Sequence, residues 1–223
     1  MRARRSPSTP RVSPVRLDDL ADASPDDLDA GVLLDGVRLA DLDLPPVHLA
    51  GAELAEVEFA RVTSDDVDLT GARLRETLLD EVRFTTLRCR GGDWQDTQVS
   101  GRVGVLDAHE ARWRSIILSD SKIDLLSLRG ADVEDLLVAD CQIGELDLTG
   151  ARVRRVRLAS TRIGTLEAAE LRCEHLDLRG ADVEVLAGLT SLRGAMVTPD
   201  QVVWWAPALA EALGLRVLTD DPR

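Results

Sequence analysis

The chain repeats an apolar position every five residues for about two thirds of its length. Every fifth residue from Leu34 to Val99 is apolar except Ser64, and after a slip of one residue the series continues from Val103 to Val183. Only 44% of the whole chain is apolar, so composition alone does not produce this run. A fixed internal period is typical of repeat architectures, in which each repeat packs against its neighbours. The repeat therefore predicts a solenoid.

A second, mostly apolar series lies two residues before each centre, as in Val32, Val37 and Leu42. Each five-residue unit thus has two inward side chains on either side of one outward residue, followed by two turn residues. Alternation over three residues is typical of a strand, whereas a period of five matches neither a continuous strand nor a helix. We therefore expect the chain to turn a corner in every unit.

The units that begin at Ala131, Ala181 and Leu146 read Ala-Asp-Val-Glu-Asp, Ala-Asp-Val-Glu-Val and Leu-Asp-Leu-Thr-Gly. They resemble the units of pentapeptide-repeat proteins, whose consensus is Ala, then Asp or Asn, then Leu and two variable residues. The resemblance implies an all-β solenoid, a right-handed quadrilateral β-helix with four units per coil and about eight coils in this chain. Leu or Val replaces Ala at many first inward positions, and this departure predicts a less uniform cross-section.

The spacing of glycines supports a coil of twenty residues independently. Gly recurs at the last turn position in Gly51, Gly71 and Gly91, and again in Gly130 and Gly150, and a small residue follows each one. Glycine at a corner permits backbone angles that other residues avoid. Gly130 and Gly150 stand one position earlier than a strict period of twenty from Gly91 would place them. This offset indicates that one residue is missing between Val99 and Val103.

Trp94 and Trp113 occupy equivalent centres of adjacent coils in this register, and their first inward partners are Gly92 and Ala111. A filled interior requires large side chains beside small ones. We therefore expect both tryptophans in the core rather than in a ligand-binding aromatic patch.

Three segments follow from composition. Residues 1–30 are rich in Pro, Ser, Arg and Asp and predict a disordered or weakly ordered leader. Residues 31–197 form the repeat region, and residues 198–223 form a C-terminal helical cap that is also a candidate dimerisation segment.

The leader has no apolar run typical of a secretory signal, and no stretch has the length of a membrane span. Cys89, Cys141 and Cys173 fall on inward positions, which favours free thiols and a cytoplasmic protein.

The cap has readable boundaries. Thr198 is the expected N-cap, Pro199 takes the first helical position, and Gln201 completes a capping box. The helix should run towards Leu213, with a kink or split at Pro207. Val202, Trp205, Leu209 and Leu213 share a face that would cover the last coil. Trp204 lies off that face, either against the solenoid or as a candidate dimer contact.

No set of residues in the sequence predicts catalysis or metal binding. The three histidines, His48, His109 and His175, lie at outward positions of different coils, so no two converge. Carboxylates are abundant, but the outward positions of the repeat account for them. We therefore expect no enzyme activity, no cofactor and no metal site.

Charge is the remaining functional signal. The chain has 40 Asp and Glu against 27 Lys and Arg, a net charge of −13, which disfavours direct binding to nucleic acid or to an anionic membrane. We expect an acidic rod that binds a protein partner, with a mostly acidic face formed by Asp107, Glu110, Asp147, Glu167 and Glu170. The alternative is a mimic of duplex DNA that modulates or protects DNA gyrase or topoisomerase, as some pentapeptide-repeat proteins do. The basic unit from Arg152 to Arg155 would interrupt such a stripe.

Overall fold

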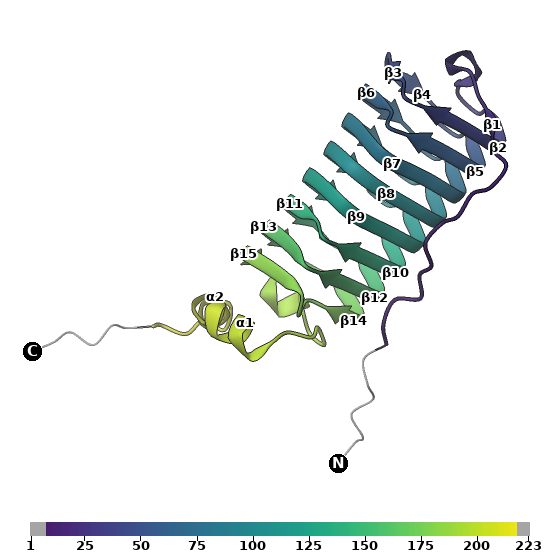
Figure 1. Cartoon of the computed structure of the whole chain (residues 1–223). Coiled ribbons are helices and arrows are strands. Elements are labelled where there is room, and N and C mark those ends of the chain that lie inside the picture. The colour runs from purple at the N-terminus through teal and green to yellow at the C-terminus, as the bar shows by residue number, and fades with distance from the viewer. Residues whose placement is uncertain (1–7, 218–223) are drawn as a thin grey trace, which may run out of the picture.

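The computed structural model describes residues 8–217. It is a parallel β-solenoid of about eight coils that ends in two short helices, as the repeat and the cap predict (Figure 1). The elements in chain order are β1 (Ala21–Asp22), η1 (Pro25–Asp27), β2 (Leu33–Ala40), β3 (Asp43–Leu44), β4 (Val47–His48), β5 (Glu53–Ala60), β6 (Thr63–Asp68), β7 (Arg73–Arg88), β8 (Asp93–Asp107), β9 (Arg112–Ser127), β10 (Asp132–Ala139), β11 (Gln142–Asp147), β12 (Arg152–Ala159), β13 (Thr161–Glu167), β14 (Arg172–Asp177), β15 (Ala181–Ala187), η2 (Leu189–Ser191), α1 (Pro199–Trp204) and α2 (Ala206–Ala212).

Strand pairing confirms the coil length of twenty residues. Leu34 of β2 pairs with Leu54 of β5, and Val133 of β10 pairs with Val153 of β12. The offset falls to nineteen between β8 and β9, where Trp94 pairs with Trp113, and the register shifts at Ser100 and Gly101. The missing residue is therefore real and lies inside the interval that the sequence predicts.

Four outer faces can be defined from the coil that contains residues 131–150. Face 1 is residues 131–135 of that coil, face 2 is 136–140, face 3 is 141–145 and face 4 is 146–150. Residues at the same place in successive coils form a column, separated by the strand spacing of about 4.8 Å. Columns therefore run along the length of the solenoid and bring together side chains far apart in sequence.

Inward columns form one continuous apolar core. Trp94 and Trp113 are fully buried, and their rings stack with centroids 5.5 Å apart and an interplanar angle of 17°. Gly92 leaves room for this pair, because a Cβ there would lie 3.2 Å from Nε1 of Trp94. The expectation that both tryptophans are core residues is confirmed.

Residues 8–30 differ from the disordered leader that their composition predicts. Ala21 and Asp22 pair with Val37 and Arg38 of β2, so β1 adds a strand at the N-terminal end of the solenoid. The backbone N–H of Arg11 donates a hydrogen bond to Asp135, with 2.8 Å between N and Oδ1. Residues 8–20 thus run along the outside of the coils (Figure 1). Polar composition did not reveal this order, because specific contacts with the solenoid provide it.

The C-terminal cap matches its sequence signals in most respects. Thr198 and Gln201 form the capping box, and the helix is split at Trp205, two residues before Pro207, which lies in the first turn of α2. Trp205 is buried and its Nε1 donates to the carbonyl of Val183 at 3.3 Å, so this residue does cover the last coil. Val202 and Leu213, expected on the same face, are 44% and 72% exposed. The split just before Pro207 accounts for this, because it breaks the single helical face on which that expectation was based.

Candidate functional site

The predicted acidic face is formed along one edge of the solenoid. Asp107 and Asp147 both pair with Ser127, and Glu167 pairs with Asp147, so all three stand in one column of face 4. Glu110 and Glu170 are exposed corner residues with φ of +55° and +58°. The five residues therefore stand on face 4, and their role in binding a partner stays a prediction.

Arginines from neighbouring coils neutralise part of this face. Arg90 pairs with Asp107 and Arg129 pairs with Asp147, and both carboxylates are close to nine-tenths buried (12% and 13% exposed). Asp107 and Asp147 also accept backbone N–H groups, from His109 at 3.3 Å and from Thr149 at 2.8 Å. These two aspartates hold their corners in shape, whereas Glu110 and Glu170 remain accessible to a partner.

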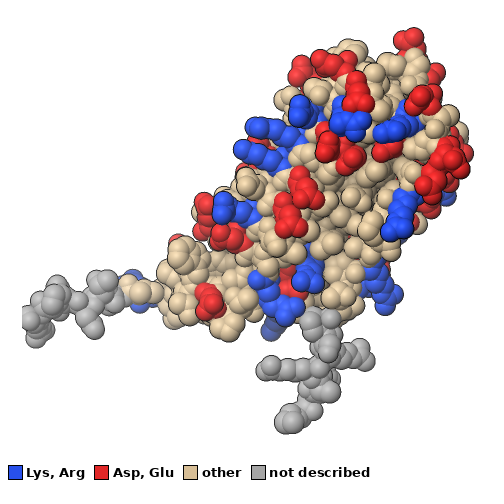
Figure 2. Space-filling view, viewed as in Figure 1, with Lys and Arg blue, Asp and Glu red and all other residues tan. Residues whose placement is uncertain are grey.

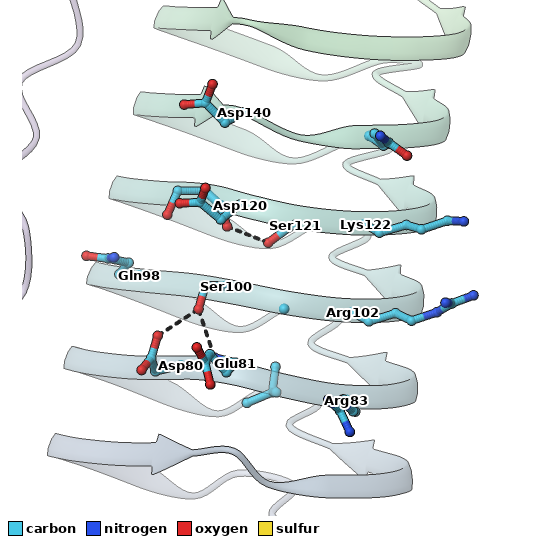
Figure 3. Close-up of a pocket in the computed structure, with 14 residues that line it drawn as sticks. Asp80, Glu81, Arg83, Gln98, Ser100, Arg102, Asp120, Ser121, Lys122 and Asp140 are labelled. Atoms are coloured by element: carbon cyan, nitrogen blue, oxygen red, sulfur yellow. Dashed lines mark hydrogen bonds between the residues drawn. The ribbon is translucent and has the colours of Figure 1, made fainter.

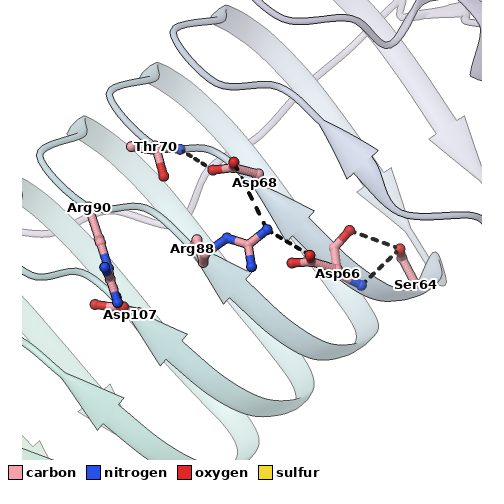
Figure 4. Close-up of polar contacts among 7 residues, drawn as sticks. All are labelled: Ser64, Asp66, Asp68, Thr70, Arg88, Arg90 and Asp107. Carbon is pink, nitrogen blue, oxygen red and sulfur yellow. Dashed lines mark hydrogen bonds and ion pairs between the residues drawn. The ribbon is translucent and has the colours of Figure 1, made fainter.

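Asp66 and Asp68 show the same arrangement two coils earlier. Arg88 bonds Asp66 at 2.6 Å and lies 4.0 Å from Asp68, whose Oδ1 accepts the N–H of Thr70 at 3.0 Å (Figure 4). Burial raises the pKa of Asp68, but the hydrogen bonds from Thr70 and the charge of Arg88 outweigh it, and the pKa lies below its ordinary value. Alternating charge is therefore built into this edge, and Figure 2 shows basic and acidic side chains interspersed on the face in view.

A second charged feature of the outer surface is not acidic. Arg83, Arg102 and Lys122 stand in one column of face 3, because Arg83 pairs with Arg102 and Arg102 with Lys122. We call these three residues the basic row. It borders a hollow of about 820 Å³ on the face 2 side, into which Ser100, Asp80 and Glu81 also project (Figure 3). The sequence analysis did not identify this row. Its members could have been found from their spacing, because Arg83 and Arg102 differ by nineteen residues and Arg102 and Lys122 by twenty, which is one coil in each case.

The most buried ion pair was also missed. The side chain of Arg155 is 9% exposed and bonds Asp135 through two contacts of 2.6 and 2.7 Å, and it also contacts Glu134. Burial raises the pKa of Asp135, but the contacts with Arg155 and with the N–H of Arg11 lower it by more, so the pKa lies below its ordinary value. These residues join three parts of the structure, the leader, β10 and β12, and we assign them a structural role.

The C-terminal end carries exposed apolar side chains. Val203 and Trp204 are 75% and 73% exposed on α1, next to the buried Trp205. Trp204 therefore does not lie against the solenoid, the first of the two alternatives for it. Trp205, not Trp204, borders a shallow apolar hollow, which is also lined by Leu192 and Leu209.

Groups suited to metal binding do not converge within residues 8–217: no three His, Cys, Asp or Glu side chains are placed to hold an ion. The three cysteines are free thiols, with Cys89 and Cys141 buried and Cys173 half-buried near the last coil. Burial raises the pKa of Cys89 well above its ordinary value, so this thiol stays protonated. None of the helices in the described range has the length and apolar character needed to cross a membrane.

Comparison with known proteins gives similarities of fold. No protein-family model matches the chain, and no curated protein matches it. Among solved structures, a trypsin-treated variant of QnrB1, a plasmid-mediated fluoroquinolone resistance protein, is 16% identical over 89% of this chain and 95% of that chain, with a TM-score of 0.34. HetL, a pentapeptide repeat protein involved in heterocyst differentiation regulation from the cyanobacterium Nostoc sp. strain PCC 7120, is 15% identical over 75% of this chain and 90% of that chain, with a TM-score of 0.22. The superposition is weak in each case, so the β-solenoid fold of this chain rests on its own twenty-residue register.

Proposed function

We propose that this pentapeptide-repeat solenoid is a non-enzymatic scaffold that binds a protein partner through its outer faces. The observation that carries the proposal is the column architecture. Outward side chains from coils far apart in sequence are held in straight rows at a spacing of about 4.8 Å, on a core that the described residues fill with buried apolar side chains. A rigid surface of this kind favours recognition by shape and charge with little ordering cost on the scaffold's side.

The acidic face supplies one docking surface, through Glu110 and Glu170 and the half-buried Glu167. Exposed carboxylates on one face suit a partner with basic side chains, because complementary charge steers association and fixes register. We place the protein in the cytoplasm, since two of its free cysteines are buried without forming a disulfide.

The test is capture of the partner by the full chain with a matched pair of variants. Reversing charge in Glu110→Lys with Glu170→Lys should lower capture about tenfold, since two favourable contacts become repulsive. Glu76→Lys with Asp132→Lys makes the same change in net charge at exposed positions of face 1 and should leave capture unchanged. Equal losses in both variants would show that only net charge matters and would contradict a docking face.

The second candidate is a DNA mimic that acts on DNA gyrase or topoisomerase. The net charge of −13 favours it, whereas the pairing of Asp107 with Arg90 and of Asp147 with Arg129 breaks the row of negative charge that a duplex presents. A gyrase supercoiling assay with added full chain, in the presence and absence of a quinolone, distinguishes the two functions. The scaffold proposal expects neither inhibition nor protection at micromolar protein.

A further inference from the structure

We propose that the basic row, Arg83, Arg102 and Lys122, binds an extended acidic segment of a protein partner. The proposal rests on the scaffold function and specifies the chemistry of one partner segment. It concerns face 3 and is separate from the acidic face, which suits basic groups.

The three cations of the basic row are unpaired within residues 8–217. All three are exposed, and none makes an ion pair or a side-chain hydrogen bond with a described residue. At several other places, charges stacked on neighbouring coils have opposite signs and pair, as in Asp41 with Arg61. Like charges stacked on adjacent strands repel each other. The three stacked cations therefore repel one another and have no ion-pair partner among the described residues, and an external anion would relieve the repulsion.

The surface on both sides of the row is hollowed. The hollow of about 820 Å³ contacts all three cations, and a second hollow of about 330 Å³ over Gly104 is lined by Arg83 and Arg102 as well. A Cβ added at Gly104 would lie 2.6 Å from the carbonyl oxygen of Thr85, so a side chain is sterically excluded there. The absence of a side chain at this position leaves the second hollow open. The basic row thus stands between two depressions that a peptide backbone and its side chains can fill.

The first hollow has an identifiable cause. Asp80 is followed by the corner residue Glu81, but the next coil passes from Ser100 directly to Gly101, which pairs with Val82. The missing corner residue leaves a gap in the surface, and the Ser100 hydroxyl stabilises its edge by donating to Asp80 and accepting the N–H of Glu81, both at 2.8 Å (Figure 3). The irregularity in the repeat therefore lies at the place where the unpaired cations stand.

Charge around the row favours a peptide over a nucleic acid. The carboxylates of Asp80, Asp120 and Asp140 line the first hollow, and those of Asp65 and Asp124 line the second. A nucleic acid backbone presents phosphates along its whole length, and the flanking carboxylates would repel them. A peptide presents carboxylates at chosen positions and N–H donors between them, which suits cations flanked by carboxylates.

The dimensions agree with an extended segment. The row spans two coil steps, or about 10 Å at a strand spacing of about 4.8 Å. Side chains on one side of an extended chain recur about every 6.6 Å, so acidic residues at alternate positions fall within reach of the long Arg and Lys side chains. We therefore expect a partner segment in which Asp or Glu alternates with small or polar residues.

The test is fluorescence anisotropy with the full chain and a labelled synthetic peptide in which Glu alternates with Ser. A peptide with Gln in place of Glu and a single-stranded oligothymidylate of similar length serve as comparison probes. The Glu peptide should bind, its affinity should fall as salt is added, and the other two probes should bind at least about tenfold more weakly.

Matched variants assign the binding to the row. Arg83→Gln, Arg102→Gln and Lys122→Gln together should weaken peptide binding at least about tenfold, and Arg102→Gln alone should weaken it severalfold. The control replaces Arg112, Arg152 and Arg172 with Gln, which removes the same charge from exposed positions of face 1 and should change binding less than about twofold. Circular dichroism checks that each variant keeps its β structure.

Three results would overturn the proposal: no binding of the Glu peptide to the wild-type chain, equal losses in the row and control variants, or equal binding of oligothymidylate through the same row. The last result would assign the row to nucleic acid. Each of these leaves the scaffold function open, because partner capture and its dependence on Glu110 and Glu170 test that function separately.

Discussion

At the scale of single residues, the corners of the coils are where sequence and conformation meet most directly. Gly51 and Gly71 take φ near +70°, as their spacing predicts, but Glu76, Asp135 and Asp140 take φ of +50°, +60° and +54° at other corners. A left-handed conformation costs a non-glycine residue about 1–2 kcal/mol. The ladder of parallel hydrogen bonds imposes the turn at these positions, so sequence alone identifies only the corners that contain glycine.

Two glycines with different surroundings separate conformational cost from steric cost. Gly71→Ala should lower the free energy of unfolding by about 1 kcal/mol, because φ is +68° and nothing lies within 4 Å of the added Cβ. Gly101→Ala should lower it by about 3 kcal/mol or more, because φ is +118° and the Cβ would lie 2.2 Å from the carbonyl oxygen of Val82. Urea unfolding monitored by tryptophan fluorescence measures both values. Equal losses would contradict the role of Gly101 in closing the shortened corner.

At the scale of elements, both ends of the solenoid are covered by segments outside the repeat. β1 pairs with the first coil, and the helices α1 and α2 pack on the last coil. Such covers are needed because an uncovered end exposes apolar side chains and unpaired strand groups. Gln201 connects the C-terminal cover to the last coil, since its Nε2 donates to the carbonyls of Leu178 and Ala181 at 2.7 and 2.8 Å.

Gln201→Glu should loosen the C-terminal cover while preserving the start of α1. The new carboxylate still accepts the N–H of Thr198, but it loses both donors and faces two carbonyl oxygens, which should destabilise the docked cover by about 2 kcal/mol. Hydrogen exchange should become about thirtyfold faster in α1 and α2. Asp200→Asn changes charge at the neighbouring exposed position and serves as the control. Unchanged exchange in Gln201→Glu would contradict the connecting role.

The leader should respond to acid through Asp135. The folded-state pKa of this carboxyl lies below its ordinary value of 3.8, so its stabilising contribution is present above about pH 4 and is lost as pH falls through the folded-state pKa. The amide chemical shift of Arg11, which donates to Asp135, should therefore titrate with a midpoint below 3.8. Asp135→Asn should abolish this titration, and Asp132→Asn on the same strand should not. A midpoint at or above 3.8 would contradict the assigned contacts.

At the scale of the whole molecule, the sequence predicts the periodic features well. The apolar centres, the slip between Val99 and Val103 and the tryptophan stack all follow from one register, and Thr198 and Gln201 mark the helical cap by local hydrogen-bond chemistry. The contact between Arg11 and Asp135 joins residues 124 positions apart outside any period, so no pattern reveals it. The neutralised aspartates and the basic row can be found in the sequence only when equivalent positions of successive coils are compared across the slip. Periodicity thus determines the framework, whereas the surface depends on which charges meet between coils.

The assembly of the molecule is the remaining prediction at this scale, and it depends on the C-terminal end. We propose that Val203 and Trp204 contact a second copy of the chain, because both are about three-quarters exposed beside the buried Trp205. An exposed tryptophan contributes binding energy at the centre of many interfaces, typically 2 kcal/mol or more, which is about a thirtyfold change in Kd.

Light scattering on the full chain should therefore give a dimer mass at micromolar protein, and Trp204→Ser should give a monomer. Leu33→Ser removes a 69% exposed apolar side chain at the opposite end of the solenoid and should leave the dimer intact. A point substitution is a sharper test than truncation after Val197, because truncation also removes Trp205 and uncovers the last coil, so that aggregation would obscure the mass. A wild-type monomer, or a dimer that survives Trp204→Ser, would assign the exposed side chain to another partner.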